Sequence, residues 1–92
     1  MNWYITTSKR IERQIQRLPA RVRDSLQVLV AELQQTGPVR GNWPNYSSLG
    51  GGRHHCHLKK GRPTYVAVWR MVNPHAREME ILYVGTHEKA PY

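Results

Sequence analysis

The chain is short of cysteine, of acidic residues and of long apolar runs, and each shortage excludes a class of protein. Its one cysteine, Cys56, cannot close an internal disulfide, and a single thiolate is too few for a cysteine-rich structural zinc site. No apolar run comes near the roughly 18 residues of a membrane span, and the first ten residues lack the apolar core of a signal peptide. We therefore expect a cytoplasmic protein with no membrane contact. Its 92 residues have room for one core, so we expect a single domain over residues 1–92.

The scarcity of acidic residues leaves a strongly basic chain. Six Asp and Glu stand against fourteen Lys and Arg, which gives a formal net charge of +8 at pH 7. Such a surface attracts polyanions such as RNA, DNA or an acidic protein, but charge alone does not separate an RNA-cutting enzyme from a passive binder. The histidines are more informative, because imidazole gives and takes protons near neutral pH. All five lie in the second half of the chain, and four of them lie in or beside its strand-like segments: His54, His55, His57 and His87.

The first half of the chain predicts a strand and two helices. Residues 2–7 are rich in β-branched and aromatic side chains, which favours a short strand. An apolar stripe at helical spacing begins just after Thr7 and Ser8, which are both suitable N-caps, and ends at Pro19. A second stripe predicts a helix from about Ala20 to Gln35. The segment that follows, residues 39–52, is rich in Gly, Pro, Asn and Ser, so we expect a long, irregular and mobile loop.

The second half predicts three strands that form hairpins. They run from Arg53 to Leu58, from Thr64 to Met71 and from Glu78 to Val84, with a turn at residues 59–63 and a loop that begins at Asn73. The order strand, helix, helix and three strands is typical of an α+β domain. We expect the helix pair to cover one face of a mainly antiparallel sheet and the other face to stay partly open, with the functional site on it.

Alternation along the predicted strands sorts their side chains into two faces. Arg53, His55 and His57 share one side of the first of these strands. Cys56 shares the other side with His54 and Leu58, which favours a buried, inert thiol and a packing role for His54. In the next strand, valines alternate with a second set that contains two large aromatic side chains: Tyr65 and Trp69.

Several of these segments resemble a known family. The Leu18-Pro19 helix junction, the segment His55–Leu58, the strand Tyr65–Arg70 and the ending Tyr83–His87 resemble the RelE/ParE superfamily of bacterial toxins, above all its YafQ-like and HigB-like mRNA interferase branches. The resemblance implies the RelE-like β-α-α-β-β-β fold. It also implies a toxin of a type II toxin–antitoxin system that cleaves mRNA, commonly in the A site of the ribosome against 16S rRNA. A cognate antitoxin, acidic or DNA-binding, would silence it.

The resemblance also assigns residues. His57 matches the catalytic histidine of the Cys-His strand, and His87 matches the histidine of the Gly-Thr-His ending. Tyr92 stands one residue away from a terminal aromatic of the family. Two positions depart from the pattern: Tyr65 takes the place of a tryptophan, and Thr64 takes the place of an aspartate.

The chemistry of RNA cleavage gives independent support to this interpretation. RNA carries its own nucleophile, the 2′-OH, so an enzyme need only remove its proton, neutralise the phosphate and protonate the departing 5′-oxygen. Two histidines and nearby cations suffice, so we expect no metal and no other cofactor, and products with 2′,3′-cyclic phosphate and 5′-OH ends. We expect catalytic roles for His55, His57, His87, Arg62 and Tyr92. We expect RNA or phosphate binding by Arg53, Lys59, Lys60, Tyr65, Trp69, Arg70 and Lys89.

Other interpretations remain open at this point. Tyr65 and Trp69 can stack on bases or simply cover the sheet. His55, His57 and His87 could hold zinc as a three-histidine centre, although no carboxylate accompanies them. A ParE-like toxin that poisons DNA gyrase by binding, or a plain RNA-binding module, would share the fold without needing the histidines. Whether the ribosome completes the site is a further question that the missing aspartate raises.

Overall fold

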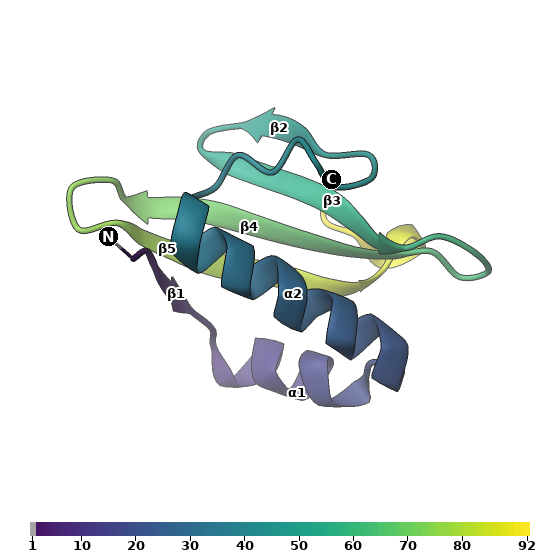
Figure 1. Cartoon of the computed structure of the whole chain (residues 1–92). Helices are drawn as coiled ribbons and strands as arrows, with labels where there is room; N and C mark the ends of the chain where they lie inside the picture. Colours follow the sequence, from purple (N-terminus) through teal and green to yellow (C-terminus); the bar gives the residue numbers. More distant parts are fainter. Residues whose placement is uncertain (1) are drawn as a thin grey trace.

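Residues 2–92, which the computed structural model describes, form five strands and two α-helices in an α+β arrangement (Figure 1). The elements are β1 (Tyr4–Thr6), α1 (Lys9–Arg17), α2 (Ala20–Thr36), β2 (Ser47–Gly50), β3 (Arg53–Lys59), β4 (Tyr65–Asn73), β5 (Glu78–Thr86) and the 3₁₀ turn η1 (His87–Lys89). The predicted fold class and element order are thus confirmed. One strand was missed, because β2 lies in the segment that we expected to be irregular throughout.

The sheet has the order β1-β5-β4-β3-β2, with β4 at its centre. The strand β1 pairs parallel with β5, and every other neighbouring pair is antiparallel. The missed strand β2 is an edge strand that contains two serines and pairs with β3 through Ser47 opposite His55. It carries no alternation of apolar residues, so its sequence gave no strand signal; its partner holds it in place.

Local signals set the ends of both helices. The Ser8 hydroxyl accepts a hydrogen bond from the backbone N–H of Ile11 at 3.2 Å, so Ser8, one of the two predicted candidates, is the N-cap of α1. The helix α2 ends at Thr36 and is capped by Gly37, whose φ of 96° favours glycine and whose N–H donates to the carbonyl of Leu33. A Cβ at Gly37 would also come within 3.1 Å of the Trp3 ring, so two constraints select glycine here.

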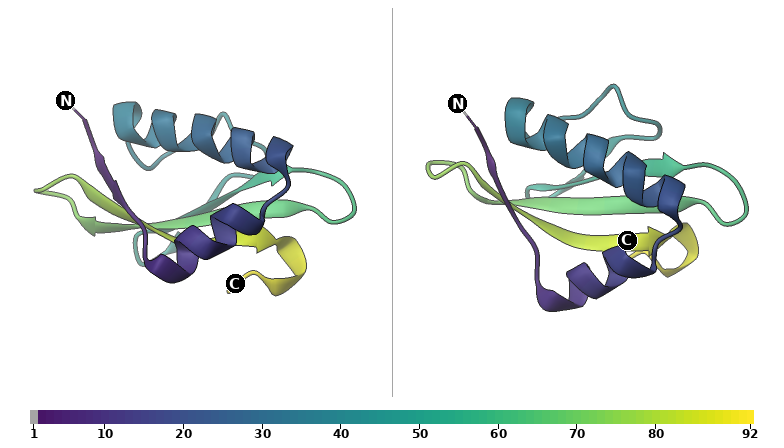
Figure 2. Two further views of the ribbon diagram at one scale, coloured as in Figure 1. Left: turned by 90° about the horizontal axis from the view of Figure 1, so that it is seen from below. Right: turned by 60° about the horizontal axis from the view of Figure 1, so that its bottom comes forward.

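The helices leave one face of the sheet uncovered. Figure 2 shows α2 running along the sheet, and its buried side chains, such as Leu29 and Leu33, join one core cluster with Cys56 and Trp69. The opposite face carries side chains of β3 and β4 in alternation with these. No helix among residues 2–92 has the length and hydropathy needed to cross a membrane.

Candidate active site

Four ring-bearing side chains gather on the sheet face that carries no helix: His55, His57, His87 and Tyr92. The ring centroids of His57 and His87 are 5.5 Å apart, and Tyr92 lies 4.5 Å from His55 and 5.9 Å from His87. The two histidines that the sequence paired are therefore neighbours in space. Tyr92 joins them because the last residues of the chain fold back over this face.

The register of the sheet explains this meeting. His57 is opposite Val66 on β4, and Val66 is opposite Gly85 on β5, so the three positions form one row across the sheet. His87 follows Gly85 by two residues, and its N–H donates to the carbonyl of Thr64 at 2.8 Å. This hydrogen bond turns the chain into η1 just beyond the sheet and brings the imidazole of His87 toward that of His57.

His57 has the environment of a proton acceptor. Its Nδ1 is buried and has no hydrogen-bond partner among residues 2–92, while its backbone N–H donates to the carbonyl of Pro44. Burial lowers the pKa of His57, and the positive charges of His87, His55 and Lys60 lower it further. The neutral imidazole is therefore favoured at physiological pH, and a neutral imidazole can accept a proton.

His55 and Tyr92 form a second pair beside His57. The Nδ1 of His55 lies 3.0 Å from the hydroxyl of Ser47, a hydrogen bond that fixes the orientation of the ring. Burial raises the pKa of the Tyr92 phenol, so its hydroxyl stays protonated and can donate a hydrogen bond. Tyr92 nevertheless keeps 46% of its surface exposed, so it is accessible to a bound molecule.

The turn between β3 and β4 brings two of the predicted cations to this cluster. Lys60 is near enough for its charge to lower the pKa of His57. Arg62 lines a hollow of about 510 Å³ together with His87 and Glu88. Lys59, the last residue of β3, is exposed. The cations next to the imidazoles thus come from the turn that joins β3 to β4.

Two other predicted cations lie at the far end of β3 and β4. Arg70 forms an ion pair with Glu80 at 2.8 Å, and it is opposite Arg53 in the sheet. Arg53 precedes His57 by four residues, about 13 Å along a strand. Neither side chain belongs to the histidine cluster, so phosphate contacts by them would fall on a distant part of a bound chain.

Lys89 and Tyr65 lie in a separate hollow of about 370 Å³ between α1 and β5. Arg10, Gln14 and Arg17 of α1 also line it. The structure therefore does not bring Lys89 or Tyr65 to the imidazoles. It places them in a basic hollow beside the end of β5, where the helix face that carries Arg10 and Arg17 meets the sheet.

The expectation that Trp69 stacks on RNA is wrong. Its side chain is 1% exposed and packs in the core beneath α2, and its Nε1–H donates to the carbonyl of Pro38 at 3.0 Å. The alternation of β4 puts it on the same face as Cys56, which the helices cover. The other interpretation, that Trp69 covers the sheet, is the correct one.

The packing roles of His54 and Cys56 are confirmed. His54 is buried, stacks on Trp69 and places its Nδ1 2.6 Å from the hydroxyl of Tyr46. Burial raises the pKa of the Cys56 thiol to about 12, so the reactive thiolate does not form at neutral pH. His75 is exposed in the loop between β4 and β5 and is far along the chain from the other histidines.

Two contributions to the site were missed from the sequence. Ser47, the partner of His55, belongs to the strand that had no recognisable pattern. The hydrogen bonds from the loop before β2 to Glu32 of α2 were also missed, because they join a helix to a loop with no periodic signal. No three His, Cys, Asp or Glu side chains in the described part of the chain are arranged to hold a metal ion, so the geometry gives the zinc alternative no support.

Comparison with known proteins places the fold. No family model matches the sequence, and no curated protein matches it either. Solved structures do match. A double arginine-to-alanine mutant of the E. coli toxin RelE in the free state superposes with a TM-score of 0.72 at 16% identity, over 96% of this chain and 86% of that one.

A chain of the archaeal RelE–RelB complex from Pyrococcus horikoshii OT3 has a TM-score of 0.64 at 15% identity, over 98% of this chain and 100% of that one. The chain therefore has the RelE fold, with two helices on a five-stranded, mainly antiparallel sheet. At these identities the likeness concerns the fold, and the function has to be argued from the site.

Proposed function

We propose that the protein is an mRNA-cleaving endoribonuclease, the toxin of a type II toxin–antitoxin system. The observation that carries the proposal is the 5.5 Å separation of the His57 and His87 rings on the uncovered face of a domain with a net charge of +8. Two imidazoles at this separation can reach opposite sides of one phosphodiester. Basic side chains beside them can hold the phosphate.

The reaction that fits this geometry is attack by the ribose 2′-OH on the adjacent phosphorus. The neutral imidazole of His57 accepts the 2′-OH proton, because burial and the neighbouring cations favour its unprotonated form. A bond forms between the 2′-oxygen and phosphorus as the bond from phosphorus to the 5′-oxygen breaks. His87, which is exposed, then gives a proton to that oxygen. The products carry a 2′,3′-cyclic phosphate and a 5′-OH.

Neighbouring side chains would stabilise the charge that develops on the phosphate. Lys60 and Arg62 supply cations, and Arg62 can offer two parallel N–H donors to the phosphate oxygens. The protonated phenol of Tyr92 supplies a further donor or a face on which a base stacks. No cofactor takes part in this scheme. His55, held by Ser47, supports Tyr92 from the other side.

The cellular setting follows from the resemblance and from the charge. We propose that the substrate is mRNA in the ribosomal A site in the cytoplasm, with 16S rRNA contributing where Thr64 replaces the aspartate of the YafQ-like and HigB-like branches. The partner that restrains the toxin would be an acidic or DNA-binding antitoxin, in keeping with the RelE–RelB pairing of one structural neighbour. Such a chain would compete with RNA for the basic face.

The test is induced expression with mapping of message ends. The parent protein should arrest growth and leave 5′-OH ends, and a variant with both His57→Ala and His87→Ala should do neither. The matched control is His75→Ala, an exposed histidine outside the cluster, which should behave as the parent. If the double variant stays as toxic as the parent, or if the parent arrests growth and leaves no cleaved message, the nuclease proposal is rejected in favour of the gyrase-binding alternative. Purified protein should cut with excess chelator present; activity that chelator abolishes and zinc restores would overturn the metal-free scheme.

A further inference from the structure

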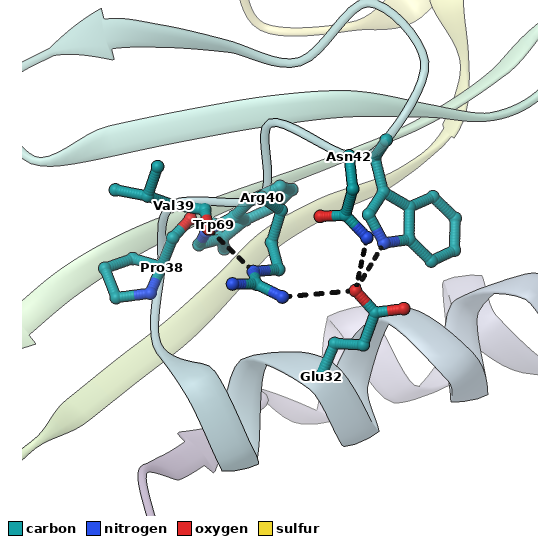
Figure 3. Close-up of polar contacts among 7 residues, drawn as sticks. Glu32, Pro38, Val39, Arg40, Asn42 and Trp69 are labelled. Atoms are coloured by element: carbon teal, nitrogen blue, oxygen red, sulfur yellow. Dashed lines mark hydrogen bonds and ion pairs between the residues drawn. The ribbon is translucent and has the colours of Figure 1, made fainter.

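Three hydrogen-bond donors from one loop converge on a single carboxylate oxygen of α2. The Oε1 atom of Glu32 accepts from Asn42 Nδ2 at 2.9 Å, from Trp43 Nε1 at 3.0 Å and from Arg40 Nη1 at 3.2 Å (Figure 3). These hydrogen bonds lower the pKa of the Glu32 carboxyl, so it is ionised at neutral pH. We call residues 38–46 the anchored loop, since Glu32 is the acceptor that holds its middle.

The anchored loop is also the segment that contacts the histidine strand. The carbonyl of Pro44, the residue after Trp43, accepts the backbone N–H of His57 at 2.8 Å. The chain then enters β2, where the hydroxyl of Ser47 holds the Nδ1 of His55 at 3.0 Å. Trp43, a donor to Glu32, is thus directly followed by the residue that contacts His57, and Ser47, which contacts His55, lies four positions after Trp43.

No other acid can easily replace Glu32. The sequence has no Asp or Glu between Glu32 and Glu78. Glu80 already forms an ion pair with Arg70, its neighbour across β4 and β5. The loop contains no helix or strand before Ser47, and its own backbone bonds are those of two short turns. Side-chain hydrogen bonds from the rest of the molecule therefore help to fix its position. Charge-assisted hydrogen bonds to one ionised acceptor are the strongest of these.

We propose that Glu32 is a positioning residue of the histidine site, acting through the anchored loop to hold His55 and His57 in place. Glu32 touches no reacting atom in this scheme. It fixes the loop that contains Pro44 and leads to Ser47. Pro44 holds the backbone of His57, and Ser47 holds the ring of His55. The inference rests on the proposed function for its catalytic consequence, but the placement of the imidazoles can be measured without any cleavage.

The experiment compares Glu32→Ala and Glu32→Gln with Asp24→Asn. Asp24 is an exposed acid on the same helix, so its variant removes the same charge without touching the loop. NMR spectra of the imidazoles should show shifted signals for His55 and His57 in Glu32→Ala, with the signals of the distant His75 unchanged. Glu32→Gln, which keeps one acceptor oxygen, should show smaller changes. Asp24→Asn should match the parent.

Cleavage supplies the second readout. Misplacement of a catalytic group lowers kcat rather than raising KM, and we expect Glu32→Ala to lose about tenfold in kcat. Its pH–rate profile should move to higher pH, because His57 gains solvent when the loop loosens. A general loss of stability would not move that profile. Imidazole signals and a pH profile that match those of Asp24→Asn would overturn the inference.

The experiment also distinguishes a variant that fails to fold from a parent protein that fails to cleave RNA. If Glu32→Ala does not fold, Trp43→Phe removes one of the three hydrogen bonds while keeping an aromatic ring, and it should shift the same two imidazoles to a smaller extent. If the parent protein cleaves no RNA, the proposed function fails, while the NMR comparison still decides whether Glu32 positions the histidines.

Discussion

Two histidines of β3, three residues apart, show how the same side chain serves different purposes on the two faces of one sheet. His54 faces the helices, where it stacks on Trp69 and lies 2.6 Å from the Tyr46 hydroxyl. His57 faces away from the helices, beside His87, and its Nδ1 has no partner in the described chain. Both have a lowered pKa through burial.

The difference lies in what each imidazole can still do. The Nδ1 of His54 is occupied and its ring is held between aromatic neighbours, so it contributes to packing. The free nitrogen of His57 is a cost to the fold, because a buried polar atom without a partner loses its hydrogen bonds to water. Such a cost is typical of a residue retained for chemistry, and it identifies His57 as the better candidate for a base.

The largest expected effect is therefore that one alanine variant loses activity and keeps its stability, while the other loses stability and keeps more of its activity. His57→Ala should lower the rate of RNA cleavage by about 100- to 10,000-fold while changing the free energy of unfolding little. His54→Ala should lose about 1–3 kcal/mol of stability, because it leaves the Tyr46 hydroxyl without its partner, and should reduce cleavage far less. Urea unfolding and oligonucleotide cleavage on both variants check this. Equal losses of activity would erase the functional contrast.

The next effect is on stability against pH. Both imidazoles have a lower pKa in the folded state than the ordinary value near 6.5, so the unfolded chain binds protons more readily than the folded one. The free energy of unfolding is therefore unaffected by these two groups at pH values well above 6.5. It falls as the pH drops from 6.5 toward the folded-state pKa of each group. Tm should decrease by a few degrees from pH 7 to pH 5 at constant salt. The decrease should be smaller in His57→Ala than in the parent, and an unchanged slope would contradict the lowered pKa of His57.

Much of this contrast was present in the sequence. Alternation along residues 53–58 already separated His54 and Cys56 from His55 and His57, because strand side chains point to opposite faces in turn. The Ser8 cap and the helical stripes placed the two helices. These signals are local, each contained within one element, so they can be interpreted without knowing the tertiary structure.

The rest depends on contacts between distant segments. Alternation divides β4 into two faces, but only its register with β3 decides which face Trp69 shares, and that register follows from the turn and the irregular pairing after His57. The fold-back of Tyr92 and the convergence of loop donors on Glu32 have no periodic signal at all. The site was therefore half predictable: the imidazoles could be paired, but the groups that hold them could not.

The smallest expected effect isolates one cation. Lys60 is among the charges that lower the pKa of His57, so Lys60→Gln should let that pKa rise and move the acidic limb of the pH–rate profile slightly toward higher pH. Lys89→Gln removes the same charge from the hollow between α1 and β5, and should leave the limb where it is in the parent. Each variant removes one cation that can contact an RNA phosphate, so each should weaken RNA binding and reduce its salt dependence by about 0.7 in log–log slope. If the acidic limb moves in both variants, distant cations lower the pKa of His57 as much as near ones do. The histidine site could then not be distinguished electrostatically from the rest of the basic surface.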